Sequence, residues 1–399
     1  MDWKIQKAED FCVGVTDGTH DSPKAVGSGR YLITSKHLGE YEIDFSSAKL
    51  ISEEDYKKVI SRSKVAQWDI LFSMIGTIGN TYLEKNETVD YACKNIGIFQ
   101  MGGDKEKAYW LYYYLKSPQA CEYIGSQLRG STQQYVPLGE LRAWPIPVPN
   151  EAIRRKIVEV LKVIDEKINT NNKINRNLLE QLDALYDNWF GKYKPFNIGI
   201  GGDPGYALED GWQIRDIYSI AEVIYGAPFT SKKFNTEGKG KPIVRIRDLK
   251  NQELCTYTPE EHPKGYLLQP GDIVVGMDGE FRPYIWGNEE AWLNQRVCVF
   301  NNVRKNGKAY VYCTIKPLLY SVETTEVATT VIHIGKKDYD EFRVVLPPED
   351  ILVEFEAVSK PIFDRIVEGQ LENRRLTKLR NGLLPKLMSG ELDVSYLNV

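Results

Sequence analysis

The feature that most constrains this chain is a repeat, in which two long amphipathic stretches with matching residues stand about two hundred residues apart. Ile164-Asp165-Glu166-Lys167-Ile168 is matched by Ile362-Phe363-Asp364-Arg365-Ile366, and Asn175-Arg176-Asn177-Leu178 is matched by Asn373-Arg374-Arg375-Leu376. A repeat of this period indicates duplicated domains, because there is room for a whole domain before each helix. Two similar domains on paired helices form a pseudo-symmetric object, and duplex DNA is the commonest pseudo-symmetric partner.

The composition limits the class of protein. The 399 residues suffice for two or three domains, and the formal net charge of -4 means that any nucleic-acid surface must be a local patch. The six cysteines lack the spacing of zinc ligands, so we predict no metal site. The start resembles no signal peptide, and no apolar run approaches the roughly 20 residues of a membrane span. We therefore expect a cytoplasmic protein with no membrane partner.

Proline and glycine mark the expected domain boundaries. The segment Trp144-Pro145-Ile146-Pro147-Val148-Pro149 cannot be helical, and Pro347-Pro348 stands at the matching place in the second half. The predicted class is α+β, with two duplicated mixed α/β domains and two long helices. The predicted segments are a first domain over 1–150, a helix over 151–192, a linker over 193–211, a second domain over 212–346 and a second helix over 347–392.

The repeat is also visible inside the globular parts. Asp69-Ile70-Leu71-Phe72-Ser73-Met74-Ile75-Gly76 aligns with Asp272-Ile273-Val274-Val275-Gly276-Met277-Asp278-Gly279. Strands are expected at Tyr31–Thr34 and Asp69–Phe72, and one helix is expected over 107–123.

The long helices carry apolar residues at alternating steps of four and three, which predicts a left-handed coiled coil. In the first helix these residues are Ile157, Leu161, Ile164, Ile168, Asn171, Asn175, Leu178, Leu182, Leu185 and Trp189. In the second they are Phe355, Ser359, Ile362, Ile366, Gly369, Asn373, Leu376, Arg380, Leu383 and Leu387. Arg380 interrupts the second series, and we expect the neighbouring Leu379 to fill part of that gap.

Asn175 and Asn373 occupy matching positions in the two series. An asparagine in such a seam lowers stability but specifies the register of the helices. If the helices run antiparallel, we expect these two side chains to meet and form a hydrogen bond. The alternative is a helical hairpin that merely holds two domains together.

Motifs for catalysis are absent from the sequence, which predicts no catalytic, cofactor-binding or metal-binding residues. It contains no phosphate-binding Gly-x-x-x-x-Gly-Lys-Ser/Thr loop, no Gly-x-Gly-x-x-Gly and no His-Glu-x-x-His. Asp278-Gly279-Glu280-Phe281-Arg282 loosely resembles the acidic motif of a metal-dependent nuclease. However, Arg282 cannot accept a proton, and the first half has no carboxylate at Ile75-Gly76-Thr77. An ordinary turn after a strand is the favoured interpretation.

Two polar segments are suited to contact with DNA. Lysine and arginine bind phosphates, whereas glutamine and arginine side chains recognise adenine and guanine. The candidates in the first half are Arg129, Ser131, Thr132, Gln133, Gln134 and Tyr135, with Arg30 and Lys36 as weaker ones. Those in the second half are Ser231, Lys232, Lys233, Lys239, Lys241, Arg245, Arg247, Lys250, Arg282, Thr329 and Thr330. The alternative for each residue is an ordinary solvated surface.

Taken together, these features resemble the specificity subunit of Type I restriction–modification enzymes. The resemblance covers nearly the whole chain and depends on the order and spacing of several segments. They are Asp69 to Gly79, Gly271 to Gly279, Leu293 to Val297, Ile146 to Pro149, Ile164 to Ile168, and Leu383-Leu384-Pro385-Lys386-Leu387-Met388-Ser389-Gly390-Glu391.

The resemblance implies that each domain is a target recognition domain that recognises one half of a split sequence in double-stranded DNA. It also implies that the helices pack as an antiparallel coiled coil with pseudo-two-fold symmetry and determine the gap between the halves. Two modification subunits would bind S-adenosylmethionine, and restriction subunits would use ATP and Mg²⁺, so no cofactor is expected in this chain. A stand-alone nuclease using Asp278 and Glu280, and a coiled-coil adaptor without DNA function, remain the alternatives.

Overall fold

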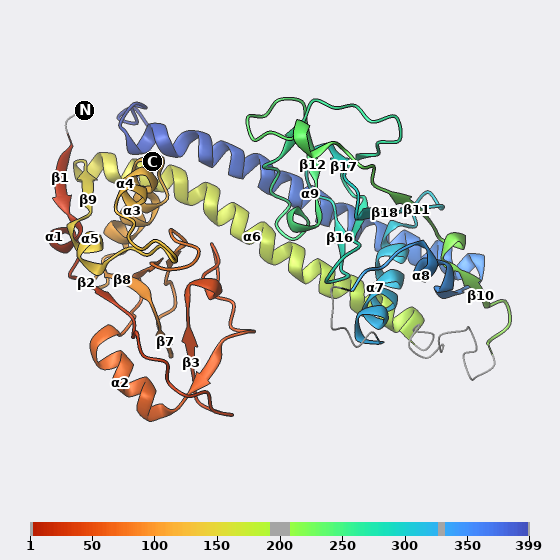
Figure 1. Ribbon diagram of the computed structural model, residues 1–399, viewed down its shortest axis with the longest axis horizontal. Coiled ribbons are helices and arrows are strands. Elements are labelled where there is room, and N and C mark those ends of the chain that lie inside the picture. The colour runs from red at the N-terminus through yellow and green to blue at the C-terminus, as the bar shows by residue number, and fades with distance from the viewer. Residues whose placement is uncertain (1–2, 192–207, 326–331, 398–399) are drawn as a thin grey trace. The chain divides into compact units, whose positions relative to one another are not determined.

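The computed structural model describes residues 3–191, 208–325 and 332–397. The chain divides into two compact units, and we describe each one by itself. Unit 1 contains Met1–Asn169 and Leu376–Val399, and unit 2 contains Thr170–Arg375. Each unit holds one globular domain of mixed helices and strands together with a segment of both long helices (Figure 1). The predicted α+β class is confirmed.

Unit 1 contains three small sheets. The main sheet is antiparallel with the order β2-β8-β5-β6, a second sheet has the order β4-β3-β7, and β1 pairs with β9. The strands are β1 (Lys4–Lys7), β2 (Gly14–Asp17), β3 (Arg30–Ile33), β4 (Lys49–Ile51), β5 (Ile70–Ser73), β6 (Thr81–Leu83), β7 (Tyr91–Cys93), β8 (Ile96–Gln100) and β9 (Pro145–Val148). The expected strands at Tyr31–Thr34 and Asp69–Phe72 correspond to β3 and β5.

Short helices complete the domain of unit 1. They are α1 (Ala8–Phe11), the single-turn helix η1 (Ser35–His37), α2 (Glu53–Ser63), α3 (Lys105–Leu115), α4 (Pro118–Ser126) and α5 (Leu138–Ala143). The single helix predicted over 107–123 is wrong, because Pro118 begins a new helix. Ser117 caps this helix by accepting a hydrogen bond from the Ala120 amide. The helices bury Trp110 and Trp144 in the same core as Phe72 and Phe99 of the main sheet.

Unit 2 repeats this topology with one additional strand in its second sheet. Its main sheet has the order β11-β18-β15-β16, its second sheet has the order β13-β12-β17-β14, and β10 pairs with β19. The strands are β10 (Gln213–Asp216), β11 (Ala221–Tyr225), β12 (Lys241–Val244), β13 (Tyr257–Thr258), β14 (Leu267–Leu268), β15 (Ile273–Gly276), β16 (Pro283–Ile285), β17 (Ala291–Leu293), β18 (Val297–Asn302) and β19 (Arg343–Leu346). The helices are η4 (Ile217–Ser219), η5 (Ser231–Lys233), η6 (Ile246–Asp248), α7 (Lys308–Thr325) and α8 (Lys336–Glu341).

The aligned segments of the sequence repeat occupy equivalent places. Asp69 and Asp272 are both buried just before β5 and β15, and each accepts backbone hydrogen bonds from the preceding turn, from Ala66 and Gln269 respectively. After these strands, Gly76 and Gly279 adopt φ angles of 81° and 82°, a left-handed conformation that glycine tolerates best. The internal repeat is therefore a structural duplication.

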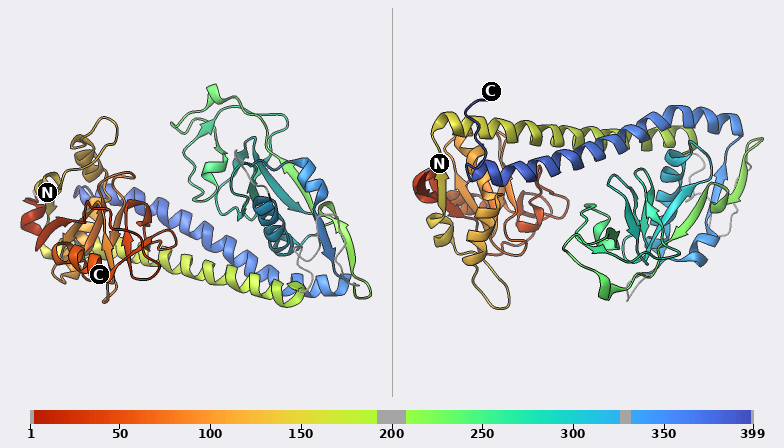
Figure 2. Two further views of the ribbon diagram at one scale, coloured as in Figure 1. Left: turned by 60° about the horizontal axis from the view of Figure 1, so that its bottom comes forward. Right: turned by 90° about the horizontal axis from the view of Figure 1, so that it is seen from above.

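The two long helices are α6 (Glu151–Phe190) and α9 (Glu349–Met388), each of 40 residues. In unit 1 the beginning of α6 packs on the end of α9, and Leu161 lies in the same core cluster as Leu384. In unit 2 the end of α6 packs on the beginning of α9, where the Phe190 and Phe355 rings meet edge to face with centroids 4.9 Å apart. The helices are therefore antiparallel within each unit, as Figures 1 and 2 show.

Two details of the predicted seam are wrong. Leu379 does not fill the gap beside Arg380, because Leu379 is 51% exposed and Arg380 itself is buried. Asn175 and Asn373 do not pair with each other. Asn373 accepts a hydrogen bond from Asn171 at 2.9 Å and donates one to Asn172 at 2.7 Å. The Asn175 side chain instead lies next to Gly369, where an added β carbon would come 2.5 Å from the Asn175 Oδ1 atom.

Within the described part of the chain, no helix combines the length and the apolar character needed to cross a membrane.

Candidate nucleic-acid interface

Two loops of unit 1 meet at one end of its main sheet. They are residues 74–80, between β5 and β6, and residues 127–136, before α5, and we call them together the loop edge of unit 1. The Val136 amide donates a hydrogen bond to the Met74 carbonyl at 3.0 Å. Arg129 and Tyr135 exchange two backbone hydrogen bonds of 2.9 Å, which close the loop like a short hairpin. The loop projects from its domain in both views of Figure 2.

The predicted base-contacting segment forms the tip of this hairpin. Ser131, Thr132, Gln133 and Gln134 are all exposed, and so is Tyr135. Arg129 lies 3.5 Å from Glu140, which holds its guanidinium beside the base of the hairpin. The structure thus brings the polar candidates together on one projecting loop, although their contact with DNA stays a prediction.

Unit 2 has an equivalent loop edge, formed by residues 277–282 and 332–335. The Ile334 amide donates to the Met277 carbonyl and the Gly279 amide donates to the Ile332 carbonyl, both at 3.0 Å. The His333 ring lies 2.7 Å from Asp278 and 2.9 Å from Arg296. Two predicted contacts, Thr329 and Thr330, lie outside the described residues.

The cluster around Asp278 does not resemble a nuclease centre. Asp278 is engaged with His333 and Arg296, and Arg282 pairs with Glu323 through two nitrogens. Across residues 3–191, 208–325 and 332–397, no group of three or more histidine, cysteine, aspartate or glutamate side chains could hold a metal ion. The arrangement therefore gives no support to the metal-dependent nuclease.

A single-turn helix next to the loop edge presents one basic residue in each unit. The Thr34 amide donates to the His37 ring at 2.8 Å in η1, and the Arg245 amide donates to the Asp248 carboxylate at 3.0 Å in η6. Burial lowers the pKa of His37, which favours the neutral ring that can accept this bond. The middle residues, Lys36 and Arg247, consequently occupy equivalent exposed positions.

The structure distinguishes Arg245 from Arg247 as candidates for contact with DNA. Arg247 is 71% exposed, whereas the Arg245 side chain is only 22% exposed and bonds to Asp248 and Thr256. Arg245 and Arg282, both predicted to contact DNA, are engaged inside their own domain by carboxylates. Arg30 is likewise paired, with Glu53 at 3.2 Å and Asp90 at 3.0 Å.

The remaining basic candidates of unit 2 are exposed. Lys233 lies 3.5 Å from Glu260, Lys239 lies 2.5 Å from Glu237, and Lys241 lies 3.3 Å from Glu290. Each acidic neighbour partly cancels the positive charge that a phosphate would meet. Ser231 and Lys232 are exposed in η5.

Unit 1 fastens its domain to the helices through a buried ionic cluster. Arg380 of α9 donates to Asp165 of α6 at 2.7 Å, to Glu40 at 2.7 Å and to the Tyr41 hydroxyl at 2.9 Å. Burial opposes the charge on Arg380, but the attraction of Glu40 and Asp165 outweighs it and raises the pKa of the guanidinium. Lys116 reaches Glu40 from α3.

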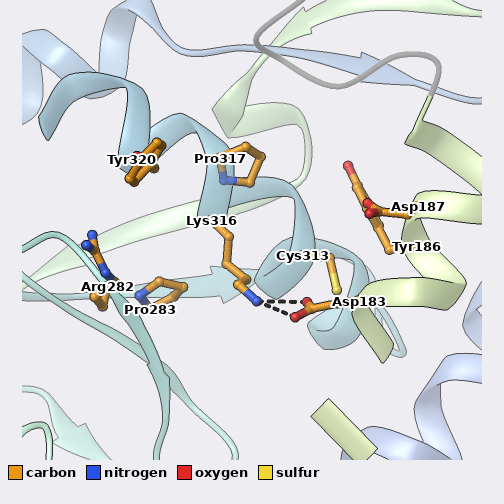
Figure 3. Close-up of a pocket in the computed structure, with 9 residues that line it drawn as sticks. All are labelled: Asp183, Tyr186, Asp187, Arg282, Pro283, Cys313, Lys316, Pro317 and Tyr320. Atoms are coloured by element: carbon orange, nitrogen blue, oxygen red, sulfur yellow. Dashed lines mark hydrogen bonds and ion pairs between the residues drawn. The ribbon is translucent and has the colours of Figure 1, made fainter. Parts of the chain in front are cut away.

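Unit 2 fastens its domain with different residues. Lys316 of α7 donates to Asp183 of α6 at 2.6 and 2.8 Å, and Figure 3 shows this pair beside Tyr186 and Cys313. Arg374 of α9 donates to the Asn251 carbonyl at 2.6 Å. Neither domain-to-helix attachment was predicted from the sequence. The available signal was a polar residue, such as Arg380, at an apolar position of the helix seam.

Comparisons with known proteins agree with this architecture. The family model described as Type I restriction modification DNA specificity domain matches residues 24–180 and 209–366. The Type I restriction enzyme MjaIX specificity subunit of Methanocaldococcus jannaschii is 27% identical over 99% of this chain and 95% of that protein. The Type I restriction enzyme EcoBI specificity subunit of Escherichia coli is 29% identical over 47% of this chain and 40% of that protein.

A solved structure shows the same fold. The S subunit of a Type I restriction–modification system from M. genitalium has a TM-score of 0.55 and 17% identity, and the match covers 97% of this chain and 96% of that one. The family match includes both domains and extends into both long helices. The chain therefore belongs to the Type I restriction–modification DNA specificity family.

Proposed function

We propose that this chain recognises DNA for a Type I restriction–modification enzyme, and that each domain recognises one half of a two-part target. The domains are residues 1–150 and 212–346, joined through the segment 193–211 and carried by the helices 151–192 and 347–392. The observation that supports this proposal is one topology present twice, with different residues on the two loop edges. A duplicated scaffold with divergent loops is suited to two different half-sites.

Each loop edge would enter a groove of the duplex. Gln133 and Gln134 have side-chain amides that pair bidentately with adenine, and Arg129 has a guanidinium that pairs with guanine. Lys36 and Arg247 would bind phosphates, which positions the domain without reading sequence. The net charge of -4 implies that the chain binds DNA weakly alone and that its partners add positive surface.

The helices α6 and α9 would act as a spacer between the half-sites. Removing seven residues from each helix shortens it by about 10 Å, or roughly three base pairs. We expect such a variant to accept a shorter gap while both half-sites stay the same. An adaptor without DNA function would show no such change in DNA preference.

The chemistry would belong to partner subunits in the cytoplasm. Two modification subunits would dock on the helices and methylate adenine with S-adenosylmethionine. Restriction subunits would use ATP and Mg²⁺ to translocate and cut double-stranded DNA. This chain would then supply no catalytic group, in keeping with the paired state of Asp278 and Arg282.

Sequencing of methylated adenines tests the proposal. The chain would be expressed with its modification partner in a host that lacks adenine methyltransferases. We expect one two-part motif with a fixed gap, which disappears when this chain is omitted. A contiguous motif, or methylation that persists without this chain, would contradict the proposal. Cleavage of DNA by the purified chain with Mg²⁺ would instead support the nuclease.

A further inference from the structure

We propose that the buried Asp165–Arg380 pair selects the correct partner for each long helix. It makes the N-terminal half of the chain pair with the C-terminal half, and it disfavours pairing between two copies of the same half. We define the N-terminal half as residues 1–191 and the C-terminal half as residues 208–399. The inference goes beyond the proposed function, because it concerns which helices assemble.

The duplication creates the need for such a selection. Both long helices have 40 residues, so Glu151 aligns with Glu349 and every residue of α6 has a counterpart in α9. Each helix therefore offers a similar apolar seam. An antiparallel pair of α6 with a second α6 would bring together residues of the same kind as those that α9 supplies.

One layer is a buried ion pair in unit 1, whereas the equivalent layer in unit 2 is apolar. Asp165 aligns with Phe363, and Leu182 aligns with Arg380. In unit 1, Asp165 and Arg380 form an ion pair of 2.7 Å, and each side chain is 8% exposed. In unit 2, the equivalent positions are Leu182 and Phe363, which are 0% and 2% exposed in one hydrophobic cluster.

A wrong pairing would separate the charges from their partners. Two N-terminal halves would place Asp165 against Leu182 of the other copy, and this would happen twice in the symmetric pair. Two C-terminal halves would place Arg380 against Phe363 of the other copy, also twice, and would lack Glu40. Leaving a buried charge without its partner weakens an interface about a hundredfold or more for each site. The native pairing leaves neither charge unpaired. Each wrong pairing leaves two buried charges without their partners, and this cost disfavours the wrong partners.

This selection has a consequence that rests on the proposed function. Each assembled protein would contain one copy of each domain, so its target would have two different halves. Homotypic pairs would instead recognise targets whose two halves are the same.

A full chain that is cut after folding tests the inference. A protease site would be placed between Phe190 and Leu208, so that no half has to fold alone. Cut proteins with tagged and untagged N-terminal halves would be mixed until the exchange of isotopically labelled C-terminal halves is complete. Mass spectrometry of the complexes captured through the tag would then count the two kinds of half. A tag on the C-terminal half would give the reciprocal count.

Two single substitutions distinguish partner selection from a general weakening of the helix pairing. Asp165→Leu removes the charge that opposes pairing of N-terminal halves, so N–N pairs should rise at least tenfold, and the C-terminal halves that they release should stay mostly unpaired. Arg380→Met should give the opposite result, with more C–C pairs and the released N-terminal halves mostly unpaired. Ile164→Ala is the control, because it weakens the seam without changing its charge and should favour neither kind.

The unmodified protein should show N–C pairs almost exclusively. The inference is overturned if the unmodified protein forms homotypic pairs freely. It is also overturned if both substitutions raise N–N and C–C pairs alike, or if neither substitution raises any homotypic pair.

Discussion

Unit 1 and unit 2 use the same sheets but different means of attachment to the long helices. In unit 1 the junction is ionic, with Arg380 held by Asp165 and Glu40. In unit 2 Lys316 and Arg304 pair with Asp183 of α6 and Glu356 of α9, and Phe355 lies among the rings of Tyr186, Trp189, Phe190 and Tyr310 at 4.9 to 6.1 Å. The main sheets of the two units have the same strand order although different contacts attach each domain to the helices. The topology therefore does not depend on one kind of contact.

The two units share one lysine–tyrosine contact but differ in the acidic partner of that lysine. Lys116 lies over the ring of Tyr112 at 4.7 Å, and Lys316 lies over the ring of Tyr312 at 5.3 Å. The acidic partners differ, however, because Lys116 reaches Glu40 whereas Lys316 reaches Asp183 of α6. Unit 1 has α2 where unit 2 has loops and β14. Divergence is therefore concentrated in connecting segments, attachments and the edge of the second sheet, and the main sheet is retained.

The largest effect should come from the aromatic junction. Phe355→Ala removes a fully buried ring, and we expect the free energy of unfolding to fall by about 3–5 kcal/mol. Val353→Ala, at an exposed position of the same helix, should change it by less than about 0.5 kcal/mol. Urea denaturation would measure both variants. Equal effects would show that the aromatic junction is not what holds unit 2 together.

The ionic junction should show strong coupling between its two charges. Arg380→Met leaves the buried Asp165 without a cation and should cost about 3 kcal/mol of stability, and Asp165→Leu should cost less, because Arg380 keeps Glu40 as a partner. The double variant should return to within about 1 kcal/mol of the unmodified protein, since an apolar pair of similar volume replaces a buried ion pair at little cost. Simple additivity of the two single effects would contradict the ionic account of unit 1.

The loop edges should affect recognition separately. Gln133→Ala should reduce discrimination at one base pair by about 1–3 kcal/mol, and only in the half-site recognised by unit 1. Gln181→Ala, on the exposed surface of α6, is the matched control and should leave both half-sites unchanged. Binding to a library of single-base variants would measure this. A loss spread evenly over both half-sites would argue against separate recognition.

The equivalent basic residues should contribute in the same way to the two units. Lys36→Ala and Arg247→Ala should each reduce the slope of the log binding constant against log salt concentration by about one. Neither should alter the preferred sequence. Arg245→Ala should instead lower the stability of unit 2 and leave the salt dependence unchanged, because Asp248 and Thr256 engage its side chain. Titrations at several salt concentrations would distinguish these outcomes.

The smallest effect concerns acid stability. Burial tends to raise the pKa of Glu40, but Lys116 and Arg380 outweigh it and hold this pKa below its ordinary value of 4.5. Glu40 therefore contributes stability that is present above this ordinary value and is lost as the pH falls through the lower pKa of the folded protein. In Glu40→Gln the free energy of unfolding should fall less steeply as the pH falls. An unchanged dependence of this free energy on pH would show that the carboxylate contributes nothing to acid stability.

Much of the fold could be predicted from local patterns. The heptad spacing from Ile157 to Trp189, the proline segments and the strand-like repeat at Asp69 each depend on residues close in sequence. The partners of Arg380 and Asn373 could not be predicted in this way. They depend on the register between α6 and α9, and one helical turn decides whether Asn373 meets Asn175 or Asn171.

The candidate site shows the same limit. The exposed hairpin at residues 129–135 follows from its polar composition, so its residues could be chosen from the sequence. Arg245 and Arg247 are indistinguishable by type. Asp248 caps the single-turn helix and hydrogen-bonds Arg245, whereas Arg247 lies 3.8 Å from the same carboxylate and stays 71% exposed. Local pattern thus identifies the segment, and tertiary contacts decide which side chain in it is exposed.

The most direct test of separate recognition is a domain exchange followed by sequencing of methylated adenines. Residues 1–150 would be replaced by the corresponding domain of a relative, with both long helices left intact. We predict that one half of the methylated target changes, while the other half and the gap stay the same. A change in both halves, or in neither, would contradict the account.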